Sequence, residues 1–308
     1  MGGRSMRYKK LDMNLLAALD VLLRTKSVSQ AADELFITQS AMSNALGRLR
    51  SFFSDPLLVQ VGRQMELSPL AQSLSDPLRD IIMRIDGSII VSPSFAPIES
   101  DREFTIVLSD YSLTVLGGEL SRRIMEDAPG VRLNLRPQMA SPEKLLERGD
   151  IDLLVVPASI AVDNHTREHL FEDKLVVLAS ADYPGPDIMD RQSFIDAPMV
   201  VMEPFFGQDS FAVLAMRAAG IEPRKAISTY AFSSMANLLK GTNRIALIQE
   251  RLARLAMAEG GFRIMAPPIA VPPLEQTLRW HRHRSRDPGL IWLRKLVKEC
   301  AAVERLHS

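Results

Sequence analysis

The sequence of 308 residues contains a single cysteine, Cys300, so no intrachain disulfide can form and a reducing compartment is expected. No apolar run reaches the roughly 18 residues that a membrane-spanning helix requires. The N-terminus also lacks an apolar stretch followed by a cleavage site, which argues against secretion. These absences predict a cytoplasmic protein without a membrane partner.

Charge of either sign is not in excess, because 37 Lys and Arg balance 37 Asp and Glu. The balance is uneven along the chain. Residues 1–64 hold nine Lys and Arg against five Asp and Glu, which gives +4 there and −4 in the remainder. A mildly basic N-terminal segment on a neutral protein is typical of a nucleic-acid-binding head joined to a non-binding body.

Enzyme motifs are also scarce. The sequence has no G-x-S-x-G elbow, no P-loop and no dinucleotide glycine pattern, although counting alone leaves a Ser-His-Asp triad open. His281 and His283 form an H-x-H pair on a predicted strand at 278–283, but no Cys, His or acidic cluster accompanies them. We expect no enzyme activity, no metal and no cofactor. The alternative is a small-molecule-binding protein or enzyme whose N-terminal helices serve only oligomerisation.

Residues 27–54 predict two short helices joined by a tight turn at Phe36-Ile37. Ser29 is the expected N-cap of the first helix and Thr38 that of the second. Four apolar residues of the second helix recur at spacings that place them on one buried face. These are Met42, Leu46, Leu49 and Phe53.

The opposite face of that second helix is small, uncharged and rich in hydrogen-bonding groups: Gln39, Ser40, Ser43, Asn44, Gly47 and Ser51. A solvated helix face normally carries Glu and Lys. Amide and hydroxyl groups on a slim face fit a DNA major groove, where they can read base edges. The spacing therefore favours DNA recognition, and an ordinary helical hairpin is the alternative.

An apolar helix capped by Asp12 precedes this pair and supplies the third wall of a small core. Residues 57–61 and 64–67 flank Gly62-Arg63 and predict a hairpin, or wing. Arg63 at its tip would reach phosphates or the minor groove, or else be a solvated turn arginine.

A helix begins at Ser68-Pro69 and carries apolar residues at alternating spacings of three and four: Ala71, Leu74, Leu78, Ile81, Ile85 and Ile89. This heptad-like seam indicates pairing with a second copy of the helix, and the alternative is one amphipathic helix lying on its own domain. Pro77 should kink or weaken the first turns. The Pro- and Ser-rich residues 92–100 are the expected linker.

From residue 103 short apolar strands alternate with helices, which predicts two lobes with parallel sheets covered by helices on both faces. The expected strands are 104–109, 131–137, 152–157, 175–180, 198–203, 244–250 and 278–283.

Three segments together resemble one family: residues 11–53, GDIDLLVV at 149–156 and RWHRHRSRDPGLIWLR at 279–294. The chain resembles the LysR-type transcriptional regulators, most closely their NodD/NahR-like branch. The resemblance implies an α/β protein with an N-terminal all-α winged helix-turn-helix, a long linker helix and a two-lobed effector domain like periplasmic binding proteins. The implied boundaries are 1–66 for DNA binding, 67–92 for the dimerising helix, 93–100 for a hinge and 101–308 for effector binding, with lobe I at 101–172 and 276–308 and lobe II at 173–275.

The resemblance also implies partners: an interrupted palindromic operator in double-stranded DNA, a second copy in a dimer and a dimer of dimers (a homotetramer), RNA polymerase and a small-molecule inducer. The family's DNA contacts fall on Thr38, Gln39, Ser40, Ser43, Asn44, Arg48 and Arg63, and we add Ser29 and Gln30 of the preceding helix. Ser40 departs from the family's usual proline. Asn44 stands where many members have arginine, which shifts the expected readout toward adenine.

In a doubly wound sheet, ligands bind beyond the carboxyl ends of strands. The expected inducer contacts are Ser109, Asp110, Tyr111, Ser112, Pro157, Asp173, Phe205, Phe206, Phe232, Ser233 and His281. Aromatic walls with hydroxyls and carboxylates suit a ring bearing hydroxyl groups, and this branch commonly senses aromatic compounds such as flavonoids. Because Asp110 would repel a ligand carboxylate, a neutral phenol or quinol is expected.

Overall fold

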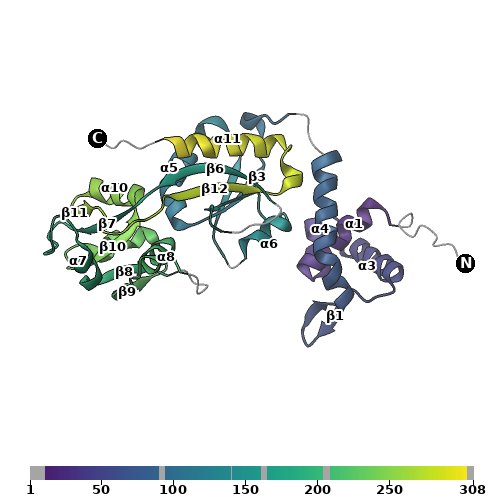
Figure 1. The fold of residues 1–308 in the computed structure, drawn as a ribbon. Helices are drawn as coiled ribbons and strands as arrows, with labels where there is room; N and C mark the ends of the chain where they lie inside the picture. Colours follow the sequence, from purple (N-terminus) through teal and green to yellow (C-terminus); the bar gives the residue numbers. More distant parts are fainter. Residues whose placement is uncertain (1–10, 90–93, 140, 161–164, 204–208, 304–308) are drawn as a thin grey trace, which may run out of the picture. The chain divides into compact units, whose positions relative to one another are not determined.

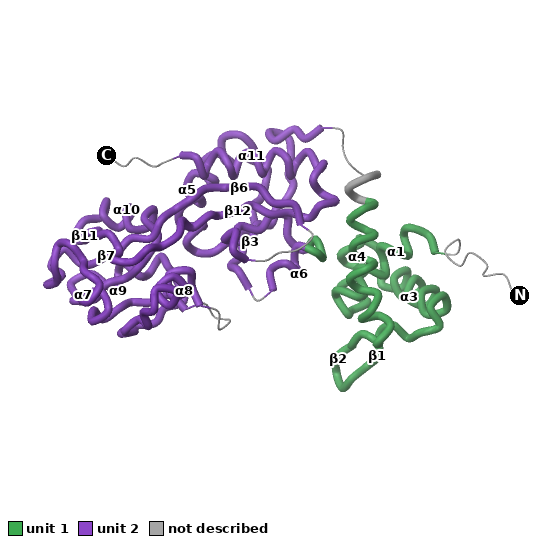
Figure 2. The backbone as a smooth tube through the Cα atoms, viewed as in Figure 1, with its two compact units in different colours: residues 1–91, 147–149 green, residues 92–146, 150–308 purple. Residues whose placement is uncertain are grey.

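The computed structural model describes residues 11–89, 94–139, 141–160, 165–203 and 209–303 (Figure 1). The chain forms two compact units, residues 1–91 with 147–149, and residues 92–146 with 150–308 (Figure 2). No helix among the described residues is both long and apolar enough to cross a membrane.

The first unit is a helical domain with a short hairpin. Its elements are α1 (Met13–Thr25), α2 (Val28–Glu34), α3 (Gln39–Phe53), β1 (Leu58–Val61), β2 (Gln64–Leu67) and α4 (Pro69–Ile89). Leu19 and Leu22 of α1, Ala31 of α2, and Met42 and Leu49 of α3 are all at most 1% exposed and form its core. Small residues on α2 let the helices approach closely, so a stable core is made from few side chains.

The N-caps agree with the sequence except at α2. Asp12 accepts a hydrogen bond from the Leu15 amide at 2.8 Å, and Thr38 accepts one from the Ala41 amide at 3.2 Å. The prediction that Ser29 caps the first helix of the pair is wrong. Ser27 caps α2, and Ser29 lies inside the helix. Its hydroxyl is 3.1 Å from that of Ser27, so a second serine close to the cap misled the assignment.

The α4 helix differs from its predicted seam. Ala71 and Leu78 are buried in the core of their own domain, and Leu74 packs against it. Arg79 of α4 also donates to Asp20 of α1 at 2.6 Å. The first half of α4 is therefore an amphipathic helix that packs on its own domain, which was the alternative to a helix-pairing seam. Pro77 does not interrupt the helix.

The second unit contains two five-stranded sheets. The first has the order β4-β3-β5-β12-β6, and the second has the order β11-β7-β10-β8-β9. The first-sheet strands are β3 (Glu103–Leu108), β4 (Arg132–Pro137), β5 (Leu153–Pro157), β6 (Thr166–Asp173) and β12 (Leu274–Trp280). The second-sheet strands are β7 (Leu175–Ser180), β8 (Met199–Met202), β9 (Lys225–Thr229), β10 (Ile245–Gln249) and β11 (Phe262–Met265).

Helices cover both sheets. The α-helices of this unit are α5 (Asp110–Asp127), α6 (Pro142–Glu147), α7 (Arg191–Asp196), α8 (Phe211–Ala218), α9 (Met235–Leu239), α10 (Glu250–Glu259) and α11 (Pro288–Ala302). The described residues of this unit also form the short 3₁₀ turns η2 (Pro97–Glu99), η3 (Phe232–Ser234) and η4 (Arg282–Arg284). In the first sheet, α5 and α11 lie on one face and α6 on the other (Figure 1).

The sheets are mixed, so the prediction of parallel sheets is wrong in part. Strand β3 runs parallel to β4 and β5, but β12 runs antiparallel to both β5 and β6. In the second sheet β7 is antiparallel to β10 and β11. The reason is the double crossing between lobes. Strands β6 and β7 are separated only by Lys174 and carry the chain from one sheet into the other, and β12 brings it back.

The strand predicted at 278–283 differs in the structure. The predicted strand 278–283 begins earlier, at Leu274, and ends at Trp280, where its pairing with Thr166 of β6 stops. His281 and His283 consequently lie at a 3₁₀ turn and not on a strand. Within the expected linker, the Phe95 ring packs against Phe104 and Trp292, with ring centroids 6.1 and 5.2 Å away.

An ion-pair network fixes the start of α11. Asp287 caps that helix through the Leu290 amide and accepts two hydrogen bonds from the Arg102 guanidinium, at 2.8 and 2.6 Å. Arg284 lies between Asp287 and Asp152, at 3.1 and 2.6 Å. Burial raises the pKa of Asp287, but the hydrogen bonds and charges of Arg102 and Arg284 outweigh it and hold the pKa well below its usual value.

We expect Asp287→Asn to lower the free energy of unfolding by about 2–4 kcal/mol near neutral pH, because two partly buried guanidinium groups lose their shared anion. A carboxyl whose pKa is depressed in the fold stabilises it above the unfolded pKa near 3.8 and loses that contribution as pH falls further. The difference between variant and wild type should therefore shrink below about pH 4. Thermal melts across pH measure it, with the exposed Asp101→Asn as control. A difference that stayed constant with pH would contradict this assignment.

Candidate DNA interface and effector site

The outward face of α3 is fixed by its buried face. Met42 and Leu49 are fully buried, so Ser43 and Asn44 point to solvent on the other side of the helix. The Thr38 hydroxyl lies 3.0 Å from that of Ser40, which orders the helix start. The result is a rigid helix whose exposed face carries short hydrogen-bonding side chains.

The structure places every predicted DNA contact on the surface of the first unit. Two residues lie on α2, one is the cap of α3, five lie on α3, and one is at the hairpin tip. They are Ser29, Gln30, Thr38, Gln39, Ser40, Ser43, Asn44, Arg48 and Arg63, and all are exposed. Exposure makes these side chains accessible to DNA but does not test the contacts, which stay a prediction.

Arg48 has a protein partner in the free molecule. Its guanidinium is 3.1 Å from the Asp12 carboxylate, and both side chains are about half exposed, at 61% and 49%. The hydrogen bond from the Leu15 amide is the main cause that lowers the pKa of Asp12; burial opposes it, and the hydrogen bond and charge of Arg48 lower the pKa further. Such an exposed pair contributes little stability, so Arg48 can exchange Asp12 for a phosphate at low cost.

The hairpin is the wing that the sequence predicted. Val61 pairs with Gln64, and Gly62 has φ +62°, a conformation that a tight two-residue turn favours. Arg50 was not singled out from the sequence, yet it connects α3 to the wing. Its side chain donates to the carbonyls of Pro56 and Leu58 at 2.9 and 3.2 Å.

The predicted effector residues gather first at the N-terminus of α5. Ser109 caps this helix by accepting from the Ser112 amide at 3.2 Å. The Asp110 carboxylate accepts a hydrogen bond from the Ser233 amide at 2.9 Å and so joins α5 of the first lobe to η3 of the second. Two predicted contacts from opposite lobes are thus adjacent.

Tyr111 and Asp173 form a second, buried link. The Tyr111 hydroxyl donates to the Asp173 carboxylate at 2.6 Å, and the two residues are 1% and 7% exposed. The amides of Lys174 and Arg251 donate to the same carboxylate at 2.8 and 3.3 Å. No local sequence pattern indicated a role for Arg251. Burial, more than the Asp173 charge and hydrogen bond, raises the pKa of Tyr111 far above its usual value, so Tyr111 stays a neutral donor.

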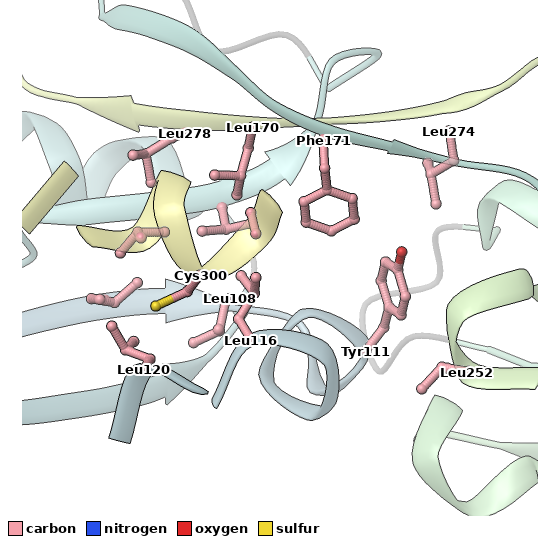
Figure 3. Close-up of a cluster of buried hydrophobic side chains, with 14 of the residues drawn as sticks. Leu108, Tyr111, Leu116, Leu120, Leu170, Phe171, Leu252, Leu274, Leu278 and Cys300 are labelled. Atoms are coloured by element: carbon pink, nitrogen blue, oxygen red, sulfur yellow. The ribbon is translucent and has the colours of Figure 1, made fainter. Parts of the chain in front are cut away.

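Aromatic rings surround this link. Tyr111 lies edge-on to Phe171 and Phe232, with both centroid distances at 6.2 Å. Figure 3 shows the Tyr111 ring beside Phe171 within the buried cluster. The expectation that Tyr111 and Ser112 line an open cleft is not met in this conformation, since they are 1% and 0% exposed. Both residues instead belong to the packed core at the junction of the lobes.

The other expected contacts lie elsewhere or are not described. The Pro157 carbonyl faces the Arg279 guanidinium at 3.4 Å. His281 is 5% exposed, and its ring centroid is 5.5 Å from that of His165 and 5.1 Å from that of His283. Phe205 and Phe206 fall outside the described residues. Among the residues that the structure describes, no group of three His, Cys, Asp or Glu is arranged to hold a metal ion.

A cavity of about 740 Å³ lies where the lobes join. Asp173 is the predicted effector residue on its wall, and the wall otherwise comes from α5, from α10 and from the segments beside the crossing strands. Three charged side chains of the wall form ion pairs, because Glu250 lies 3.2 Å from Lys174 and 3.3 Å from Arg254.

The chain matches two described sequence families and several known proteins. Residues 99–302 match the LysR substrate binding domain, and residues 13–72 match the bacterial regulatory helix-turn-helix protein, lysR family. The chain is 34% identical to nodulation protein D 2 of Rhizobium leguminosarum bv. phaseoli over 301 residues, which covers 96% of this chain and 94% of that protein. It is 33% identical to nodulation protein D 1 of Mesorhizobium japonicum, covering 96% and 95%.

Solved structures agree over nearly the whole chain. A probable transcriptional regulator of Pseudomonas aeruginosa is similar with a TM-score of 0.67 and 25% identity, covering 96% of this chain and 99% of that one. Full-length OxyR of the same organism has a TM-score of 0.71 over 95% of both chains, but at 12% identity it shows a shared fold alone.

Proposed function

The chain belongs to the LysR family of transcriptional regulators, and from that membership we propose that it is an inducer-responsive activator that reads DNA with α3. The observation that carries the proposal is the exposed, uncharged face of α3, with Ser43 and Asn44 at its centre and Arg48 and Arg63 beside it. Short polar side chains read base edges in the major groove, and the two arginines bind phosphates. Acting on chromosomal DNA places the protein in the cytoplasm.

We propose that the protein binds an interrupted palindrome as a homodimer, and that two dimers associate on DNA. Support comes from a stripe of exposed residues on α4. It lies next to the apolar stripe that packs in the core of the first unit. Leu70 and Ile81 are 36% and 46% exposed, and the exposed Pro77 lies between them. Their spacing is that of a helix-pairing seam. Two-fold symmetry would set two α3 helices on equivalent half-sites.

The inducer is proposed to be an aromatic molecule that acts where the lobes meet. The residues there include Asp110 and Ser233, joined across the lobes, and the half-buried Phe232. A carboxylate at this position disfavours an anionic ligand, so we propose a neutral phenol or quinol, with flavonoids among the candidates given the similarity to nodulation protein D. The ligand would shift the angle between lobes and thereby change contacts with DNA and RNA polymerase.

A gel shift tests the DNA-binding part of the proposal. The full chain should form a salt-sensitive complex with the intergenic DNA upstream of its own gene, and a scrambled fragment should compete poorly. Thermal-shift screening against phenols, quinols and flavonoids tests the inducer class. The regulator proposal would be abandoned if no sequence-specific complex formed with or without such ligands.

A further inference from the structure

Phe36 adopts a backbone conformation that disfavours its own side chain. It lies in the turn between α2 and α3 with φ +53°. This left-handed region suits glycine or asparagine, and for a bulky residue it is a true outlier. Such strain persists when the surrounding structure imposes it, and it often marks a functional position. Here the Phe36 amide donates to the Asp33 carbonyl at 3.2 Å and the Ile37 amide to the Ala32 carbonyl at 3.0 Å, which holds the turn.

The Phe36 ring gains nothing from folding that would offset the strain. Its side chain is 95% exposed, and among the described residues no hydrophobic core cluster includes it. Leu57 shows the contrast. It also has a positive φ, at +57°, but it is 1% exposed and packed in the core. An aromatic ring that is both strained and solvated is better explained by an external partner than by stability of this fold.

The position of Phe36 indicates which partner. It stands two residues before Thr38, the cap of α3, and the intervening Ile37 is 42% exposed. Thr38 and Gln39 continue the exposed surface into the helix that reads DNA. The ring is thus contiguous with the proposed DNA interface and carried on a fixed turn. The apolar group that a major groove offers is the C5-methyl of thymine, which phenylalanine can contact.

We propose that Phe36 contacts a thymine methyl group in each operator half-site and so contributes to sequence preference. This assignment rests on the proposed DNA-binding function and deepens it. Asparagine at position 36 gives a sharp test, since it tolerates the left-handed backbone and removes the ring. Phe36→Asn should leave the thermal midpoint unchanged or higher, yet weaken operator binding by about 10-fold. If Phe36 had only a structural role, Phe36→Asn would lower the thermal midpoint and the operator affinity together.

The experiment is a coupled substitution in protein and DNA. Wild type and Phe36→Asn are titrated against the operator fragment and against copies in which each half-site thymine is replaced in turn by deoxyuridine, which lacks the methyl group. One deoxyuridine position should weaken wild-type binding several-fold and leave Phe36→Asn binding unaffected. Ile188→Asn removes an apolar side chain that is 86% exposed in the other unit and should change neither quantity.

The outcomes separate the two proposals. Two results would overturn the assignment of Phe36 alone. In the first, wild type binds the operator normally and Phe36→Asn binds it equally well. In the second, no deoxyuridine position weakens wild-type binding more than Phe36→Asn binding. Failure of the wild-type chain to discriminate operator from scrambled DNA overturns the proposed function and this assignment with it.

Discussion

Replacing Ser43 and Asn44 together by alanine is expected to weaken operator binding by about 100-fold or more. Each base contact of this kind is worth about 1–3 kcal/mol, and a dimer makes it in two half-sites. Both side chains are exposed and make no described contact with the core, and alanine favours a helix. Folding should therefore be intact. Binding to scrambled DNA should persist, because the proposed phosphate contacts of Arg48 and Arg63 remain.

The measurement is a salt titration of operator and scrambled fragments with the double variant. Gln72→Ala is the control, since it removes an exposed polar side chain of α4 in the same unit, outside α3 and on the side of α4 away from the Leu70 and Ile81 stripe. The double variant should keep the salt slope of non-specific binding and lose the operator preference. A preference for the operator that survived the double substitution would refute the roles of Ser43 and Asn44.

Removing the Asp173 carboxylate should strongly destabilise the effector unit. Asp173→Ala leaves the buried Tyr111 hydroxyl and the amides of Lys174 and Arg251 without their acceptor. A loss of about 3 kcal/mol in the free energy of unfolding is expected, because each unsatisfied buried donor costs about 1–3 kcal/mol and such costs do not add fully. Since this carboxylate lies where the chain passes between lobes, the variant should also lose its thermal response to inducer.

Asp173→Asn serves as the conservative control. It keeps one carbonyl acceptor, and we expect it to lose only about 1 kcal/mol. Burial, partly opposed by its hydrogen bonds, raises the pKa of Asp173. A carboxyl with a raised pKa in the fold stabilises it below the unfolded pKa near 3.8 and loses that contribution as pH rises through the folded pKa. The stability of Asp173→Asn relative to wild type should therefore improve as pH rises above about 4. Urea unfolding at several pH values measures this change. If Asp173→Ala and Asp173→Asn lost the same free energy of unfolding, the carboxylate would not be the shared acceptor.

In the two lobes, the sequence predicted the α/β class correctly but the direction of some strands wrongly. Alternating strands and helices after residue 103 correctly predicted an α/β body, because period and composition encode local structure. Strand direction was wrong for β7 and β12. Direction depends on which strands the crossing segments join, and no local pattern encodes that pairing.

The effector residues show a similar limit. Asp110 and Ser233 were both expected near the inducer, and the structure brings them to 2.9 Å across the lobes. Tyr111 was expected on an open wall and is instead buried, with its hydroxyl on Asp173. A residue after a strand can point into a cleft or into the core, and the packing of the second lobe decides between them.

For α3, the sequence alone determined the buried stripe, the polar face and the cap, since helical periodicity fixes which residues share a side. Family membership also followed from its motifs. Only the tertiary structure decided that α4 first packs against its own domain, and that Arg50 connects α3 to the wing. It also decided that Phe36, in the turn before α3, has a strained backbone and an exposed ring. These depend on contacts between distant segments and on one backbone angle, and neither is encoded in local residue spacing.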